Sequence, residues 1–238
     1  MTVRRTLRRL LWRFGYDLRY LPSLKFSSIG LDQFEDAKHH TRADRPVIFD
    51  VGANVGQSIT RARKHWPSSV IHAFEPSEAT FAILKKNTFG MPNLHLNQCA
   101  LGANGGQATF LLYADSVHSS ILAPGAGLAP SAVIGEQSVT VRTVDEYCAE
   151  HHIDRVDLLK IDTQGYDLEV LRGAERTLRS APVVFVELTF SDTYAGQPPY
   201  YEVLRFLHET GFALGGIYDI TYGAGRADWA DAMLYRTA

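Results

Sequence analysis

The stretch VIFDVGANVGQS, residues 47–58, decides the fold of this chain. An apolar, partly β-branched run ends at Asp50 or Val51, and the residues Gly52 to Gly56 follow as a glycine turn. A helix is expected to begin near Val55. Strand, glycine turn and helix in this order are typical of the first unit of a doubly wound α/β protein.

Three residues of this turn have separate conformational roles. Gly52 lets the backbone turn sharply, and Asn54 tolerates left-handed geometry better than most other non-glycine residues. Gly56 allows the helix to approach a strand or a ligand closely. Because ligands of doubly wound folds bind outside the carboxyl end of the first strand, the turn predicts the mouth of a cofactor site.

The rest of the chain alternates between strand and helix patterns. Apolar runs predict strands at 46–51, 69–74, 94–99, 155–161, 182–188 and 231–236. Helical patterns separate several of them, at 55–65, 77–88, 144–151, 166–179 and 199–210. This alternation predicts a parallel sheet with helices on both faces. Shorter strands are expected at 107–112 and 138–143, with a hairpin-like return between Gln98 and Leu112 and a long loop over 116–134.

Composition excludes several other classes of protein. The chain has 238 residues, of which 45% are hydrophobic and 21% charged, as in a soluble globular protein. The net charge of -2 creates no global attraction to nucleic acid or to a membrane. Cys99 and Cys148 are the two cysteines, too few for a disulfide framework, which suits a reducing cytoplasm. No apolar run is long enough to span a bilayer.

The first segment differs from the rest, and we expect two parts, an extension over 1–44 and the main domain over 45–238. Residues 1–20 predict a basic amphipathic helix with one apolar face, formed by Leu7, Leu10, Leu11, Phe14 and Leu18. Such a helix could lie on an anionic membrane or contact a partner. The preferred interpretation is a helix packed on the domain, with its arginines in solvent.

The second predicted strand ends in HAFEPS, which places Glu75 23 residues after Gly52. An acidic residue at this position can accept hydrogen bonds from both hydroxyls of a ribose. Pro76 then begins the next helix, where a missing N–H costs nothing. Strand, glycine turn, helix, strand and acid in register predict a cofactor that contains a ribose.

The residue at the centre of the turn favours one such cofactor over another. A dinucleotide pyrophosphate needs a glycine where Asn54 stands, because backbone amides must come very close to it. S-adenosylmethionine carries no phosphate. Asp50 could meet its ammonium directly or through water, and amides at the helix start could meet its carboxylate. An NAD-dependent oxidoreductase and a non-catalytic scaffold with the same fold are the alternatives.

Two later strands also end in acids, Asp162 after VDLLKI and Glu187 after PVVFV. If these strands lie beside the first one, both acids share one rim of the sheet with Asp50. Three carboxylates repel one another unless a cation is present, and a sulfonium, a divalent metal or a substrate amine could serve. Alternatively, Asp162 caps the following helix and Glu187 pairs with a neighbouring arginine.

Several motifs together resemble one known family. FDVGANVGQ, HAFEPSEATFAILKKN, NQCALGANGGQATF, KIDTQGYDLEVLRGA and VVFVE are similar to segments of the FkbM family of S-adenosylmethionine-dependent methyltransferases, over about residues 45–190. The resemblance implies a class I methyltransferase fold, which is Rossmann-like, with a doubly wound seven-stranded sheet whose last strand is antiparallel. The run DAMLYR, residues 231–236, can be that last strand.

The resemblance also implies an activity and a set of site residues. Members of the family methylate a hydroxyl on sugars, glycolipids or secondary metabolites, so we expect a small-molecule or glycan acceptor. The family pattern distributes the cofactor contacts along the chain: the amino acid end at Asp50, Gly52, Asn54 and Gly56; the ribose at Glu75 and Pro76; the adenine near Ala100 and Leu101; cofactor or substrate at Ser119 and Ser120; and the transferred methyl at Asp162.

Methyl transfer to a hydroxyl requires alignment of the acceptor oxygen behind the sulfonium methyl, and a base or Lewis acid helps this poor nucleophile. Asp162 is the first candidate for base or metal ligand. His118 is a second candidate base because it lies in the long loop next to Ser119 and histidine commonly takes up protons near neutral pH, unless it is simply an exposed loop residue. A divalent metal between Asp162 and Glu187 stays open but unassigned, because oxygen-ligand sites need more donors.

The segment YAGQPPYY, residues 194–201, has two interpretations. Its aromatic rings could stack on a sugar or another flat acceptor. Its two prolines could equally open a helix at Tyr200.

Overall fold

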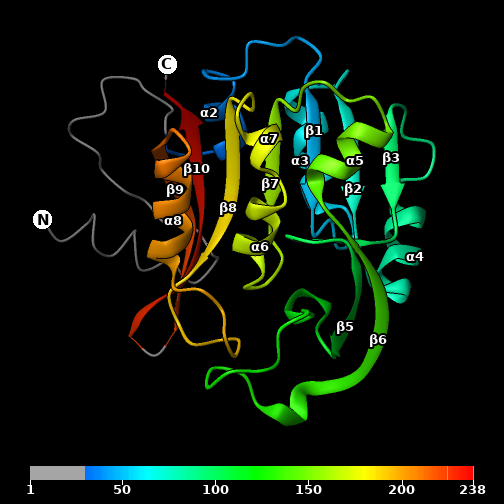
Figure 1. Cartoon of the computed structure of the whole chain (residues 1–238), viewed down its shortest axis with the longest axis vertical. Helices are drawn as coiled ribbons and strands as arrows, with labels where there is room; N and C mark the ends of the chain where they lie inside the picture. The colour runs from blue at the N-terminus through cyan, green and yellow to red at the C-terminus, as the bar shows by residue number, and fades with distance from the viewer. Residues whose placement is uncertain (1–29, 224, 238) are drawn as a thin grey trace, which may run out of the picture.

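The computed structural model describes residues 30–223 and 225–237 and contains a twisted sheet of seven strands (Figure 1). The strand order is β3-β2-β1-β7-β8-β10-β9, and β10 runs antiparallel to both of its neighbours. The prediction of a seven-stranded class I methyltransferase sheet is therefore confirmed. Its strands are β1 Val47–Val51, β2 Val70–Phe74, β3 Leu94–Asn97, β7 Leu158–Ile161, β8 Val183–Thr189, β9 Phe212–Gly223 and β10 Arg226–Arg236.

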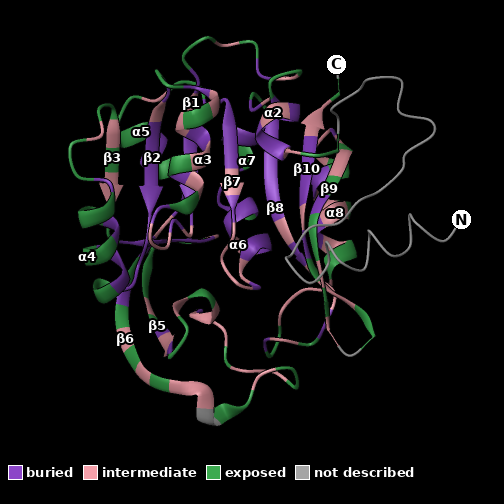
Figure 2. Ribbon diagram, turned by 180° about the vertical axis from the view of Figure 1, so that it is seen from behind, coloured by how far each residue is buried: buried purple, intermediate pink, exposed green. Residues whose placement is uncertain are grey.

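Helices cover both faces of this sheet, and its central strands are almost wholly buried (Figure 2). Burial on both faces explains why these strands are continuous apolar runs in the sequence. One core cluster includes side chains of α2 Gln33–Ala37, α3 Gln57–His65 and α4 Glu78–Asn87. The opposite cluster includes side chains of α5 Val144–Glu150, α6 Asp167–Arg172, α7 Glu175–Leu178 and α8 Tyr200–Glu209.

A second sheet of three strands, β4 Ala100–Leu101, β5 Gly106–Tyr113 and β6 Val133–Arg142, lies below the carboxyl ends of the large sheet in Figure 1. Its order is β4-β6-β5, so β6 separates β4 from β5. The predicted hairpin between Gln98 and Leu112 is therefore wrong, although the chain does reverse there. The expected loop over 116–134 contains the 3-10 turns η1 Ser116–His118 and η2 Pro130–Ala132 and the first residues of β6.

The helix expected over 166–179 is divided in two, and the reason is a close backbone contact at Gly173. A Cβ atom at Gly173 would lie 2.0 Å from the carbonyl oxygen of Gly102. The carbonyl of Gly173 also accepts a hydrogen bond from the backbone N–H of Asp145 at 3.0 Å. These contacts join the end of α6 to the turn after β4 and to the start of α5, and the chain begins α7 two residues later.

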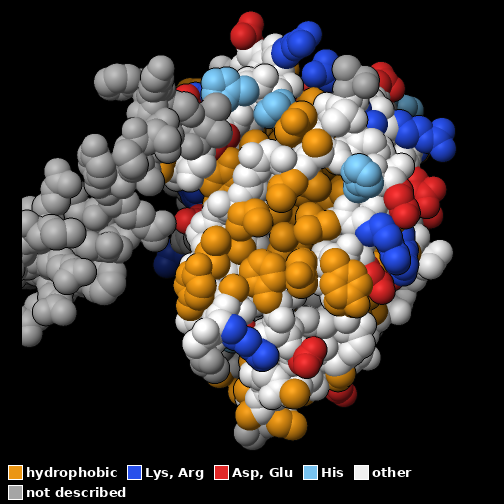
Figure 3. Space-filling view, turned by 90° about the vertical axis from the view of Figure 1, so that its left-hand side faces the viewer, with side chains coloured by type: hydrophobic (Ala, Val, Ile, Leu, Met, Phe, Trp, Pro, Cys, Tyr) orange, Lys and Arg blue, Asp and Glu red, His pale blue; other side chains and the backbone are white. Residues whose placement is uncertain are grey.

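The edge strand β9 was not predicted, because FALGGIYDITYG contains three glycines and lacks a clean alternation of apolar and polar residues. Figure 3 shows hydrophobic side chains gathered over the β9 end of the molecule. The exposed apolar side chains that β9 contributes are Leu214, Ile217, Ile220 and Tyr222. None of the helices within the described ranges combines the length and the apolar character that crossing a bilayer requires.

The predicted amphipathic helix over 1–20 lies outside the described residues. Closer to the domain, α2 packs on the large sheet, with the Phe34 ring edge-on to Phe185 at 5.2 Å. The side-chain amide of Gln33 donates to the Asp231 carboxylate at 3.2 Å. The described part of the N-terminal segment thus shares the core of the main domain, and a division at residue 44 stays a prediction.

Candidate active site

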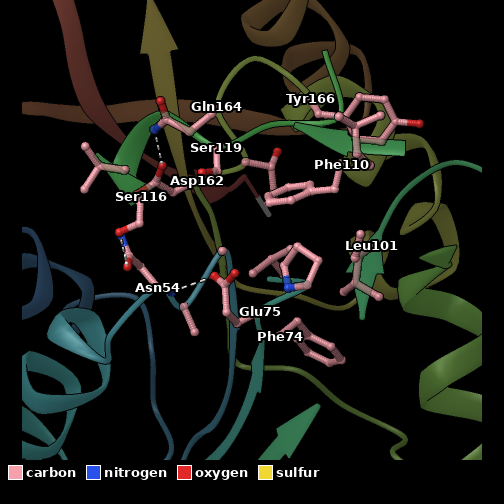
Figure 4. A pocket seen from close by; sticks show the side chains of 18 of the residues that line it. Asn54, Phe74, Glu75, Leu101, Phe110, Ser116, Ser119, Asp162, Gln164 and Tyr166 are labelled. Carbon is pink, nitrogen blue, oxygen red and sulfur yellow. Dashed lines mark hydrogen bonds between the residues drawn. The ribbon is translucent and has the colours of Figure 1, made fainter. Parts of the chain in front are cut away.

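A cavity of about 220 Å³ opens at the carboxyl ends of β1, β2 and β7, where the strand order reverses (Figure 4). Its walls are the turn after β1, the ends of β2 and β4, part of β5, the η1 loop and the turn after β7. This is the position at which doubly wound folds bind ligands. Most of the residues predicted for the cofactor lie on these walls, including Gly52, Asn54, Glu75, Pro76, Ala100, Leu101, Ser119 and Asp162.

The glycine turn is fixed by a close backbone contact at Gly52, by backbone hydrogen bonds and by the left-handed conformation of Asn54. A Cβ at Gly52, where φ is 78°, would lie 1.8 Å from the Asp162 carbonyl oxygen. The backbone N–H groups of Gly52 and Ala53 both donate to the Phe74 carbonyl at 3.0 Å. Asn54 has a φ of 46°, and its side-chain oxygen accepts from the Ser116 hydroxyl at 3.2 Å. Gly56 caps α3 behind the cavity, without lining it.

Glu75 stands at the end of β2 with its carboxylate on the cavity wall (Figure 4). One carboxylate oxygen accepts from the Asn54 backbone N–H at 3.0 Å and the other from the Ser77 N–H at 2.9 Å. Burial raises the pKa of Glu75 to about 7, although both hydrogen bonds oppose the rise. The carboxylate is therefore rigid and partly desolvated, as a ribose-binding acid requires.

Lys160 is a site residue that the sequence analysis missed. Its ammonium group lies 3.1 Å from Asp50 Oδ1 and 3.4 Å from Asp162 Oδ2. It also donates to the Gly52 carbonyl at 3.1 Å. Burial alone would lower the pKa of Lys160, but the two carboxylates raise it above its ordinary value. A cation among the carboxylates was expected, and a lysine inside the apolar run LLKID was the available signal.

Asp50 itself lies beneath the cavity and is not part of its wall. Burial raises the pKa of the Asp50 carboxyl, and the charge of Lys160 counteracts the rise. Any influence of this side chain on a ligand therefore passes through Lys160 or the turn backbone. Its assignment to the cofactor ammonium stays a prediction.

Asp162 and Glu187 are joined by Gln164, which was also not predicted. The Gln164 amide nitrogen donates to Asp162 Oδ1 at 2.9 Å and to Glu187 Oε2 at 3.0 Å. The alternative in which Glu187 pairs with a neighbouring arginine does not match this contact, because its partner here is the Gln164 side-chain amide. Asp162 does not cap α6, since Tyr166 holds the N-cap position. Burial raises the pKa of Glu187 well above its ordinary value, and nearby acids, Asp162 first, raise it further.

The opposite end of the cavity is apolar. Ala100 and Leu101 line it as expected, together with Phe74, Phe110 and Tyr166. The contribution of Phe110 could not be read from the sequence, because its strand belongs to the second sheet, whose pairing was mispredicted. An apolar slot beside a buried carboxylate matches the two halves of an adenosine.

The η1 loop brings Ser116, Val117 and Ser119 onto the wall, whereas its two neighbours His118 and Ser120 do not line the cavity. Ser120 is fully buried, and its hydroxyl donates to the Gln164 carbonyl at 2.8 Å. The carbonyl of His118 accepts from the Tyr194 hydroxyl at 2.9 Å. The predicted roles of His118 as base and Ser120 at the ligand are not tested by these contacts.

Within residues 30–223 and 225–237, no group of three or more His, Cys, Asp or Glu side chains has the arrangement of a metal site. The His40 ring stacks on the Tyr235 ring, with centroids 4.2 Å apart. Lys160 supplies a positive charge between the carboxylates of Asp50 and Asp162 at the sheet rim.

The strand order reverses beside β1, the glycine turn after β1 has Asn54 at its centre, and Glu75 stands at the end of β2. Together these features are those of a class I S-adenosylmethionine-dependent methyltransferase. Residues 50–214 match the model of the methyltransferase FkbM domain. The chain therefore belongs to the FkbM family of methyltransferases, whose methyl donor is S-adenosylmethionine. The family match confirms the methyltransferase prediction and decides against the oxidoreductase alternative.

Similar proteins agree with this assignment. The chain is 26% identical over 172 residues to the 2-O-methyltransferase NoeI of Sinorhizobium fredii, covering 68% of this chain and 71% of NoeI. It is 30% identical over 166 residues to the hexuronic acid methyltransferase AglP of Haloferax volcanii, covering 68% of this chain and 62% of AglP. The fold is similar to that of the fibrillarin pre-rRNA processing protein of Methanococcus jannaschii, with a TM-score of 0.50, 13% identity and coverage of 82% and 68%.

Proposed function

We propose that this enzyme transfers the methyl group of S-adenosylmethionine to a hydroxyl oxygen of a small-molecule or glycan acceptor, with a sugar hydroxyl as the preferred class. The observation that carries the proposal is one cavity with Glu75 at its centre, an apolar slot on one side and Asp162 on the other. Two relatives support the acceptor class, since one is named a 2-O-methyltransferase and the other a hexuronic acid methyltransferase.

The residues present fit the donor in three parts. Glu75 would accept hydrogen bonds from the ribose hydroxyls, and Phe74, Leu101 and Phe110 would contact the adenine. The turn from Gly52 to Asn54 would hold the amino acid end, with the ion pair of Asp50 and Lys160 beneath it. Bound in this way, the donor supplies an electrophilic methyl group on a sulfonium.

Asp162 would act on the acceptor. About a third of its side chain is exposed, and it lines the cavity beside the turn after β7. In this position its carboxylate can accept the proton of an acceptor hydroxyl while holding the oxygen in line with the methyl group. Alignment accounts for most of the rate in such a displacement, so Asp162 would serve both as positioning group and as general base.

The charge of the cavity favours a neutral acceptor. Among the described wall residues Lys160 is the one cation, and it is engaged by Asp50 and Asp162. Glu75 and Asp162 contribute negative charge, so an anionic acceptor would meet repulsion without a compensating partner. We therefore propose a neutral polyhydroxylated acceptor, in contrast to the uronic acid named for AglP.

We further propose that the enzyme works in the cytoplasm and without nucleic acid as a partner. Both cysteines are free and buried, which suits a reducing compartment. The net charge of -2 gives no general attraction to nucleic acid. Contact with a membrane surface through residues 1–20 is the less favoured alternative.

Isothermal titration calorimetry with S-adenosylhomocysteine tests the cofactor site directly. We expect one site per chain, and about a tenfold loss of affinity in Glu75→Ala, because two hydrogen bonds to a buried carboxylate are removed. Glu78→Ala, the same change in the first turn of α4 and outside the cavity, should bind like the wild type. Absence of any binding to the wild type would contradict the proposal.

Turnover is tested with a panel of neutral and anionic sugars and S-adenosylmethionine carrying a labelled methyl group. Asp162→Asn should bind S-adenosylhomocysteine but lose at least about a hundredfold in turnover, since the amide cannot take up the proton. Unaltered turnover in this variant would remove Asp162 from the role of base.

A further inference from the structure

We infer that Gln164 is a positioning residue that holds the Asp162 carboxylate toward the bound donor, and that Tyr194 fixes the orientation of the Gln164 amide. The inference rests on the proposed function, because it places Asp162 beside the sulfonium. It concerns two residues that were not predicted to position Asp162: Gln164 on the turn after β7 and Tyr194 on the loop after β8.

The hydrogen bonds of Gln164 leave its amide only one orientation. Both hydrogens of the amide nitrogen are used, one by Asp162 and one by Glu187. The amide oxygen accepts from the Tyr194 hydroxyl at 2.9 Å. A flipped amide would direct its oxygen at Asp162 and Glu187 and leave the Asp162 carboxylate without this N–H donor. The observed orientation is therefore the one in which the amide donates to both acids.

The backbone of Gln164 is also committed to this arrangement. Its φ of 56° lies in the left-handed region, which non-glycine residues seldom adopt. Its carbonyl accepts from the buried Ser120 hydroxyl at 2.8 Å. A residue in this conformation whose side chain and carbonyl are both hydrogen-bonded is expected at a functional site, where the surroundings compensate for the strain.

Tyr194 is the residue that locks this turn. It is buried, with 2% of its surface exposed, and its ring lies over Gly165, where an added Cβ would be 3.0 Å from the ring. Its hydroxyl is shared between the Gln164 amide oxygen and the His118 carbonyl. Its backbone forms a bridge to Pro124. The ring is thus unavailable for stacking on an acceptor, and Tyr194 instead joins the turn after β7 to the η1 loop.

The charges around Asp162 show why an uncharged hydrogen-bond donor, the Gln164 amide, matters at this position. Acidic and basic groups face it from every neighbouring element: Asp50 on β1, Lys160 on β7, Asp167 on α6, Glu187 on β8 and Asp231 on β10. Without the amide, Asp162 would lose this N–H donor, and its carboxylate would turn further toward Lys160. The carboxylate would then be less available to a cation in the cavity.

The comparison of S-adenosylmethionine with S-adenosylhomocysteine measures this effect without an acceptor. The two ligands share every group except the methyl, and only the first carries the sulfonium charge. We define the selectivity ratio as Kd for S-adenosylmethionine divided by Kd for S-adenosylhomocysteine, both from calorimetry. A general loss of structure weakens both ligands, whereas a displaced Asp162 weakens only the cation and raises the ratio.

We expect the ratio to rise about fivefold in Asp162→Asn and in Gln164→Leu, as for the loss of one partly solvated charge interaction. Tyr194→Phe keeps the ring over Gly165 and removes only the hydroxyl, so we expect a smaller rise of about twofold. The double variant of Gln164→Leu and Tyr194→Phe should equal Gln164→Leu alone, because the hydroxyl acts through the amide. Gln107→Leu, the same change on an exposed part of β5, should keep the wild-type ratio.

Three results would overturn the inference or its basis, and they are distinguishable. A wild-type ratio in Gln164→Leu together with a raised ratio in Asp162→Asn shows that Gln164 does not position Asp162. A wild-type ratio in both variants shows that Asp162 does not face the sulfonium. Failure of the wild type to bind either ligand refutes the proposed function itself. If Gln164→Leu does not fold, an unchanged ratio in Tyr194→Phe is sufficient to refute the positioning role.

Discussion

At the scale of single residues, Glu75 has the most direct consequence for binding. Its pKa is raised to about 7 by burial, so about half of the ligand-free molecules carry a protonated Glu75 at neutral pH. Hydrogen bonds from two ribose hydroxyls need the ionised carboxylate, which already accepts from Asn54 and Ser77. Binding below pH 7 must therefore include the loss of a proton.

The affinity for S-adenosylhomocysteine should accordingly rise about tenfold from pH 6 to pH 8, as linkage to a single group with a pKa near 7 requires. Calorimetry in buffers of different ionisation enthalpy would measure both the affinity and the proton released. Glu75→Gln cannot ionise, and its affinity should be nearly constant over this range. An equally steep pH profile in Glu75→Gln would assign the effect to another group.

The residue scale also shows what sequence patterns can and cannot predict. Glu75 was identified because its spacing from the glycine turn is fixed by the local strand-helix-strand unit. Lys160 and Gln164 were missed, because their roles depend on β1, β7 and β8 lying side by side. A lysine in an apolar strand has no evident partner until the strand order brings Asp50 to within 3.1 Å of it.

At the scale of elements, the errors have the same physical origin. The apolar periodicity over 166–179 predicts one helix, and a glycine inside a helical pattern is usually tolerated. What divides this helix is the contact of Gly173 with the carbonyl of Gly102, 71 residues earlier in the chain. The hairpin around LGANGG was mispredicted in the same way, since β6 inserts between the two short strands.

Gly173→Ala tests this contact. A Cβ at 2.0 Å from a backbone oxygen cannot be accommodated without a shift, so we expect a loss of at least about 2 kcal/mol in the free energy of unfolding. Urea denaturation followed by circular dichroism would measure it. Gly135→Ala on β6 meets only Leu112 at 3.8 Å and should change stability by less than about 0.5 kcal/mol. Equal midpoints for the two variants would contradict the role of the contact.

At the scale of the whole molecule, the alternation of strands and helices was predictable because each element repeats the same signal, whereas the order of the strands in the sheet was implied only by the family resemblance. Buried parallel strands are continuous apolar runs, and each acid at the rim follows one of them. The antiparallel β10 was expected only through the family resemblance, and β9 not at all. The site therefore depends both on local sequence patterns and on which strands are neighbours in the sheet. Only the local patterns could be read along the chain.

The rim of acids should give the ligand-free protein an unusual pH dependence. Burial raises the pKa of Glu75 to about 7 and that of Asp167 and Asp231 to about 6, and Glu187 is raised well above its ordinary value. An acid with a raised pKa stabilises the folded state at low pH, and this contribution is lost as the pH rises through the folded value. His72, whose pKa burial lowers to about 4, acts in the opposite direction below pH 6.5.

The most informative window is therefore pH 6.5 to 8, because the opposing contribution of His72 lies mainly below its unfolded-state pKa of 6.5 and fades as the pH rises further. Glu75 should cost about 1 kcal/mol of stability across it, and Glu187 should add to the loss. For a chain of this length, a loss of that size lowers the melting temperature by about 2 to 4 °C. Differential scanning calorimetry should show this decrease in the wild type and a smaller one in Glu75→Gln. Saturating S-adenosylhomocysteine should reduce the decrease, because it binds the ionised form. A melting temperature that rises over this window would show that the buried acids are already ionised in the ligand-free enzyme.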